Sequence, residues 1–191
     1  MDAVAQYALA YALTTSAGVR ALLPLAAASA AAHAGWIHPP GEFAWLGHGA
    51  VMWILIASAV VEMLADKVPL IDHAMHFVQV ASKPAAAAIL IGGTTHPHGN
   101  GELIGLMAVG ALNALGIHGA VVATRAASTV GTGGFANPFV STIEDTGSIA
   151  TIVLAFVAPV VAAVLALIAT IVLILFARYV YHRMRVEPGA M

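Results

Sequence analysis

Long apolar stretches, separated by short polar connections, follow one another along this chain of 191 residues. A helix needs about 20 apolar residues to cross the hydrocarbon core of a membrane. Apolar stretches of about this length or longer cover residues 4–32, 50–65, 70–91, 102–127 and 143–181. The last is too long for one straight span, and Pro159 divides it. The pattern therefore predicts an all-α integral membrane protein with five or six transmembrane helices.

The composition supports the same class. Hydrophobic residues make up 61% of the chain and charged residues only 8%, whereas soluble domains carry about 25% charged residues. There is no cysteine, which excludes disulfides and thiolate metal sites. The net charge of −2 does not favour nucleic acid as a partner. The expected partner is the lipid bilayer, because the chain is so apolar. The first residues lack a basic segment, and no cleaved signal peptide is expected.

The orientation follows from the C-terminal end. Arg178, Arg183 and Arg185 are three of the seven Lys and Arg residues in the chain. Loops rich in Lys and Arg stay on the cytoplasmic side of a membrane. We therefore expect the C-terminus to be cytoplasmic.

The chain divides into two halves, residues 1–92 and 101–185, within one membrane domain that covers residues 1–191. The sequence around Gly18 has a short counterpart around Gly116, and a polar, proline-containing break follows each. If three spans precede the second copy, the two copies cross the membrane in opposite directions. The pattern then predicts an inverted repeat with broken helices, as in many transporters, although a chance match of this length is the open alternative.

Charged residues are concentrated between residues 62 and 76. This stretch contains Glu62, Asp66, Lys67, Asp72, His73 and His76. Charge at membrane depth is costly, and it is usually paired or functional. Glu62 and Asp66 are four residues apart and share a helix face. Two interpretations stay open: a buried ion-pair network that holds helices together, and a pathway for an ion, a proton or a solute.

Prolines divide the predicted helices. The expected breaks are at Pro24, Pro69, Pro84, Pro138 and Pro159, because proline lacks an N–H group and restricts the preceding residue. Pro24 would leave the carbonyl group of Arg20 without its helical partner. Arg20 itself, near the middle of the first stretch, needs a carboxylate or carbonyl partner. The candidate carboxylates are Glu62, Asp66 and Glu144.

The second half supplies further polar groups. Glu144 and Asp145 are expected near a helix start that follows Asn137 and Pro138. The cations expected to pair with the carboxylates are Arg20, Lys67, Lys83 and Arg125. The oxygen-bearing residues Glu62, Asp66, Asp72, Asn137, Glu144 and Asp145 could hold a hard cation, or carry protons together with His76. His73 and His76 form a weaker candidate site for a transition metal, and no cofactor other than a bound cation is expected.

These residues form motifs that resemble a known family. The motifs are Gly18-Val-Arg20-Ala, Glu62-x-x-x-Asp66-Lys67-x-Pro69-x-x-Asp72, Lys83-Pro84 and Gly133-Gly134-x-x-Asn137-Pro138-x-x-Ser141-x-x-Glu144-Asp145. Together they resemble the bacterial membrane family labelled domain of unknown function 4126, over about residues 10–165. The resemblance implies a bacterial inner membrane and favours the regions Glu62–Asp72 and Asn137–Asp145 as the site, but the family label implies no activity.

The sequence thus favours a small membrane transporter or channel for a cation, a proton-coupled ion or a small polar solute. A chain of this length is expected to act as a homo-oligomer, with its Ala- and Gly-rich faces packed together. The alternatives are a structural or accessory membrane subunit and an intramembrane enzyme acting on a lipid-linked substrate. No H-E-x-x-H, Walker A or G-x-S-x-G motif occurs, so no catalytic residue is assigned.

Overall fold

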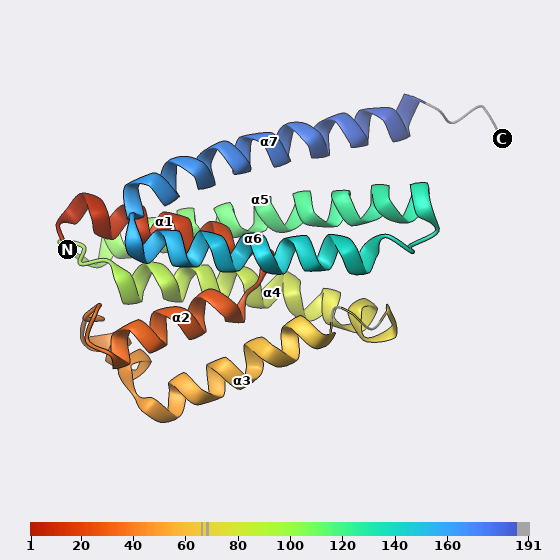
Figure 1. Cartoon of the computed structure of the whole chain (residues 1–191). Coiled ribbons are helices and arrows are strands. Elements are labelled where there is room, and N and C mark those ends of the chain that lie inside the picture. Colours follow the sequence, from red (N-terminus) through yellow and green to blue (C-terminus); the bar gives the residue numbers. More distant parts are fainter. Residues whose placement is uncertain (66, 68, 187–191) are drawn as a thin grey trace.

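The chain folds into a bundle of helices whose axes are roughly aligned, with consecutive helices running in opposite directions (Figure 1). The computed structural model describes residues 1–65, 67 and 69–186, and for residues 69–77, 180 and 183–186 it describes the backbone alone. The described elements are α1 (Ala3–Val19), α2 (Leu22–His33), the short 3-10 helix η1 (Gly41–Gly47), α3 (Gly49–Ala65), α4 (Pro69–Thr94), α5 (Asn100–Thr132), α6 (Asn137–Val157) and α7 (Pro159–Val186). No strand occurs in the described part, which confirms the all-helical prediction.

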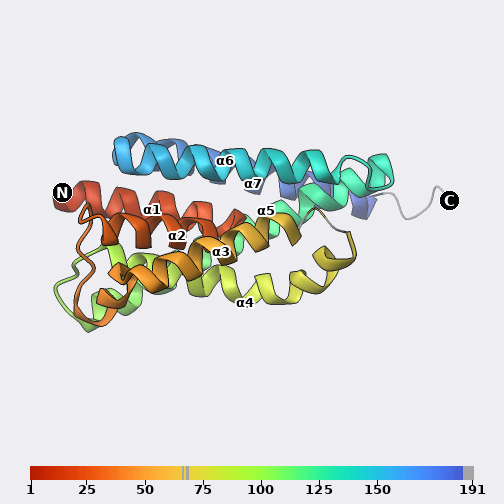
Figure 2. The same cartoon turned by 60° about the horizontal axis from the view of Figure 1, so that its bottom comes forward.

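The first apolar stretch is not one span. The chain leaves α1 at Arg20, which has an extended backbone (φ −129°, ψ 111°), and α2 then runs back beside α1 (Figures 1 and 2). Pro24 is the third residue of α2, a position where a missing N–H group costs no helical hydrogen bond. The 12 residues of α2 extend only about 18 Å, less than the hydrocarbon core of about 30 Å. The break therefore makes a helical hairpin with Arg20 at its tip.

The hairpin also changes the relation between the two halves. Because α2 returns toward the starting end, α1 and α5 run in the same direction (Figures 1 and 2). The predicted inverted repeat, in which the segments around Gly18 and Gly116 cross the membrane in opposite directions, assumed that the first stretch crosses the membrane once. The inverted relation between these two segments is therefore not confirmed.

Helix α1 lies at the centre of the bundle. It contacts α2, α4, α5, α6 and α7, and Leu9, Leu13 and Ala17 on it are completely buried. Helix α7 lies across α1, α5 and α6, whereas α3 lies to the outside against α2. Polar contacts join α1 to α5 as well, since the Asn113 side-chain amide donates to the hydroxyls of Thr14 (3.2 Å) and Thr15 (3.0 Å).

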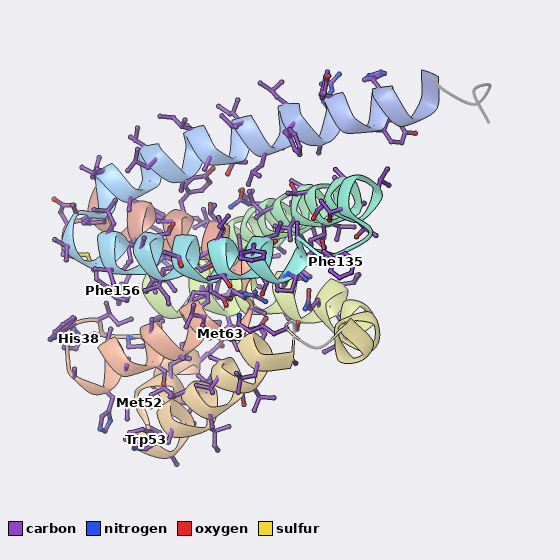
Figure 3. All side chains as sticks on the ribbon, turned by 45° about the vertical axis from the view of Figure 1, so that its right-hand side comes forward. His38, Met52, Trp53, Met63, Phe135 and Phe156 are labelled. Carbon is purple, nitrogen blue, oxygen red and sulfur yellow. The ribbon has the colours of Figure 1, made fainter. Side chains whose placement is uncertain are left out.

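Three described helices are long and apolar enough to cross a membrane: α5, α6 and residues Pro159–Tyr179 of α7. A fourth span results if η1 and α3, which meet at an angle of 68°, are counted together. The outer surfaces of these helices carry exposed large apolar side chains, such as Ile168 and Val172 on α7. Figure 3 shows many such side chains projecting from α7, and Trp53 pointing away from the bundle on α3. These features indicate a membrane protein, while the count of five or six spans is not confirmed.

The prolines have different local effects. Helix α4 begins at Pro69, α6 has Pro138 in its first turn, and α7 begins at Pro159. The predicted break at Pro84 is wrong, because Pro84 lies inside α4 and the helix continues through it. Because α4 is packed against both α1 and α5, its neighbours hold the helix where the proline removes one hydrogen bond. Such prolines are tolerated in helices of membrane proteins for this reason.

Candidate functional site

Arg20, at the tip of the α1–α2 hairpin, is the centre of a buried charged cluster. Its side chain is only 1% exposed, and its Nε lies 2.7 Å from Oδ1 of Asp145. Its Nη2 lies 3.7 Å from Oε2 of Glu144 and donates to Oγ of Ser141 at 3.0 Å. One face of α6 thus receives the guanidinium group. Glu144 was among the partners expected from the sequence, but the closer carboxylate is Asp145.

Asp145 is shared between two cations. Its second oxygen, Oδ2, lies 2.6 Å from Nζ of Lys67, which follows the end of α3. The sequence predicted Lys67 as a partner of the carboxylates without naming which one. The observed partner is 78 positions away, because the fold brings the residue that follows α3 beside Asp145 on α6. Asp145 therefore links the hairpin tip to α3.

Glu144 forms the second strong pair of the cluster. Arg125 on α5 donates from Nε to Oε1 of Glu144 at 3.2 Å and from Nη2 to Oε2. A bidentate arginine–carboxylate pair of this kind is stronger and more directional than a single hydrogen bond. The pair joins α5 to α6, and through Arg20 it continues to the hairpin.

Glu62 on α3 has another role. Its side chain is buried (3% exposed), and its two oxygens accept from the backbone N–H groups of Ala21 and Leu22, both at 2.9 Å. The first N–H groups of a helix have no partner within the helix, and its N-terminus favours negative charge. Glu62 therefore caps α2 from a neighbouring helix and stabilises the break beside Arg20.

The cap leads to a testable change in stability. Replacing Glu62 with glutamine is expected to lower the free energy of unfolding by about 1–3 kcal/mol, because the amide offers one acceptor for two buried N–H groups. Denaturant or thermal unfolding in one detergent measures the difference. The matched control is Glu42→Gln on exposed η1, which should unfold like the unchanged protein. Equal stability of the two variants would contradict the capping role.

Lys83 and His118 form a buried pair beside the charged cluster. Nζ of Lys83 lies 2.9 Å from Nδ1 of His118, and the two residues are 2% and 6% exposed. The sequence predicted Lys83 as a partner of carboxylates. Its hydrogen bond goes to an imidazole, and it also interacts electrostatically with the carboxylates of Glu62 and Glu144. This contact links α4 to α5.

Some predicted site residues do not join the cluster or cannot be placed. Asp66 lies outside the described residues, as do the side chains of Asp72, His73 and His76. Asn137 donates to the hydroxyl of Thr129 at 3.0 Å, so it joins the start of α6 to the end of α5. Glu144 and Asp145 were expected at a helix start, but α6 already begins at Asn137, about two turns earlier. Proline is tolerated in a first helical turn, which explains the earlier start.

Charges balance within the described cluster. The carboxylates of Glu62, Glu144 and Asp145 face either helix N–H groups or the cations of Arg20, Lys67 and Arg125. The side chains of Asp66 and Asp72, which the sequence also placed in this group, lie outside the described residues. Among the described residues, no group of three His, Cys, Asp or Glu side chains could hold a metal ion. The cluster is therefore an ion-pair network that joins four segments of the bundle.

A cavity of about 510 Å³ borders this network between α1, α5, α6 and α7. Glu144 forms part of its wall, together with Ser16 and Ser148. Sequence reasoning missed Ser148 and gave Ser141 no role. Ser141, Asp145 and Ser148 are spaced i, i+4 and i+7, which places them on one helix face, so this polar stripe on α6 was a readable signal.

Comparison with known proteins agrees with the family that the motifs resemble. The sequence matches the family described as Domain of unknown function (DUF4126) over residues 7–179, and the chain belongs to this family. No curated protein and no solved structure matches the chain.

Proposed function

We propose that this member of the DUF4126 family is a small transporter or channel of the bacterial inner membrane. Its substrate would be a cation, a proton-coupled ion or a small polar solute. The proposal includes a cytoplasmic C-terminus, five or six spans and a homo-oligomer. What supports it is a buried charged network at a broken helix, the arrangement that transporters use to bind ions near the middle of the membrane.

The observation that carries the proposal is the sharing of Asp145 between Arg20 and Lys67. A carboxylate with two cationic partners can exchange one of them for a proton or a bound cation while keeping the other. Such an exchange would release Lys67, the more exposed of the two cations (38% exposed), from Asp145. The end of α3 would then be free to move against α6, while Arg20 still holds the α1–α2 hairpin to Asp145.

Flux through purified protein in proteoliposomes tests the proposal. The panel consists of Na⁺, K⁺, protons and small polar solutes, each compared with protein-free liposomes. Flux of at least one of them is expected, and Lys67→Gln should change its rate several-fold because the exchangeable partner of Asp145 is lost. Glu42→Gln, far from the network in sequence and exposed on η1, should retain the original rate. If folded protein moves none of the panel, the transport proposal fails.

One observation favours a second function, that of a structural or accessory membrane subunit. The described carboxylates of the network already have protein partners, which a purely structural network would require. In that case Lys67→Gln would change stability or assembly with partner proteins, and no flux would depend on it. The flux panel and an unfolding measurement on the same variant therefore separate the two functions.

A further inference from the structure

A groove of about 560 Å³ lies between α5 and α7, and none of the charged network's residues lines it. Its volume is within the range of about 300–1,000 Å³ that is typical of small-molecule sites. Small residues of α5, including Gly116 and Gly119, form one wall, and one face of α7 with Ile174, Arg178 and His182 forms the other. The residues on each wall recur at the spacing of a single helix face.

The walls of this α5–α7 groove can be reached from outside the protein. A Cβ atom added at Gly116 or Gly119 meets no atom within 4 Å, and Arg178 and His182 are exposed. Helix α7 rises away from the rest of the bundle toward its C-terminal end, which leaves the groove open there (Figure 1). A molecule in the groove can therefore contact the glycines and the guanidinium group directly.

The groove is apolar at one end and basic at the other. Helices α5 and α7 run in the same direction (Figure 1), so Gly116 and Ile174 lie toward one end of the groove. Arg178 and His182 lie one and two turns beyond Ile174, and the apolar span of α7 ends at Tyr179. Arg178 is thus at the level where the hydrocarbon core gives way to lipid headgroups. The apolar end suits an acyl chain, and the basic end suits a headgroup.

The charge of the walls selects an anionic headgroup. The residues that line the groove, all within the described part of the chain, include no Asp or Glu. Arg20 and Arg125 pair with carboxylates of α6, but the groove offers Arg178 no such partner. A guanidinium group binds phosphate through two parallel hydrogen bonds, and basic pockets between transmembrane helices bind anionic lipid headgroups.

We propose that the α5–α7 groove binds an anionic phospholipid of the bilayer. Its phosphate group bonds to Arg178, with His182 beside it, and the upper part of one acyl chain lies over Gly116 and Gly119 against Ile174. The inference is independent of transport, because it concerns lipid binding alone.

Native mass spectrometry of the purified protein in detergent tests the lipid class. The probes are dioleoylphosphatidylglycerol and dioleoylphosphatidylcholine, which carry the same acyl chains. The anionic lipid should bind about tenfold more tightly, as expected for hydrogen bonds between charged groups. Equal binding of the two lipids would overturn the proposal and identify the groove as a crevice for lipid tails. Displacement by inorganic phosphate alone would also overturn it, because the site would then bind a free anion.

A variant that fills the groove shows whether the lipid binds there. Gly119 lines the groove with open space above it, so Gly119→Leu should fold normally and lose most of the preference for the anionic lipid. Gly105→Leu is the matched control, because Gly105 is also an exposed glycine of α5 with open space around it but does not line the groove. An equal preference in the two variants would refute the site and leave only a general attraction of charge.

A variant of the arginine separates recognition of the headgroup from binding of the chain. Arg178→Gln should lower the affinity for dioleoylphosphatidylglycerol about tenfold and leave that for dioleoylphosphatidylcholine unchanged. An unchanged preference for the anionic lipid would overturn the role of Arg178. The proteoliposome flux panel is a separate measurement, so failure of transport and failure of lipid binding are distinguishable.

Discussion

Replacing Arg20 with methionine is expected to lower the free energy of unfolding by about 3–5 kcal/mol, the cost of breaking a buried ion pair by removing one partner. Arg20 is 1% exposed and contacts two carboxylates of α6. Methionine keeps an unbranched apolar stem but lacks the guanidinium group, so the variant removes the charge together with its ion pairs and hydrogen bonds. In this variant Asp145 still pairs with Lys67. Because Lys67 is partly exposed, that pair contributes little to the free energy of unfolding and does not replace the buried pair with Arg20.

Unfolding of purified protein in detergent, followed by circular dichroism, measures this loss. Arg178→Met is the control, because Arg178 is exposed on α7, and it should unfold like the unchanged protein. Combining Arg20→Met with Asp145→Leu should recover part of the stability, since replacement of both members of a buried pair by apolar residues is often neutral. A single variant as stable as the control would show that Arg20 does not hold the hairpin.

Replacing Gly18 with leucine is expected to cost about 3 kcal/mol, at the upper end of the usual cost of overpacking. A Cβ atom at this position would lie 2.5 Å from Cβ of Ile117 and 2.7 Å from the carbonyl oxygen of Ala114. Neither atom can move without the backbone of α5, so α1 and α5 would have to separate. Because α1 is the central helix, the separation would also disturb its packing against its other neighbours.

Gly105→Leu on α5 is the matched control for this change. A Cβ atom at Gly105 meets nothing within 4 Å, and leucine favours helix more than glycine does by about 0.5–1 kcal/mol. Its stability should therefore be unchanged or slightly raised under the same detergent conditions. If the two leucine variants unfold alike, the close approach of α1 and α5 at Gly18 is not important for folding.

Much of the charged site was readable from the sequence because charge is rare in this chain. Arg20, Glu62, Lys67, Glu144 and Asp145 were all singled out as costly in an apolar segment, and the fold brings all five together. Their pairing was not readable. Lys67 and Asp145 are 78 positions apart, and helical spacing relates only residues within a few turns of one another.

The hairpin at Arg20 shows a different limit of sequence reasoning. Hydropathy reports whether a stretch is apolar, and residues 4–32 are apolar whether they cross the membrane or turn back. The turn depends on Glu62, which accepts hydrogen bonds from the N–H groups of Ala21 and Leu22 from a helix about 40 positions away. Without that cap, two buried backbone groups at the break would lack partners, at a cost of about 1–3 kcal/mol each.

The sequence by itself determined the helical class, the membrane setting, the family and most residues of the charged network. The length of the apolar stretches, the scarcity of charged residues and the short motifs are local properties of the sequence. They do not depend on how the helices pack. Only the tertiary structure decided that the first stretch is a hairpin, that Asp145 joins Arg20 to Lys67, and that Glu62 caps the start of α2. These features depend on contacts between helices distant in sequence, where the need to satisfy every buried polar group selects the partners.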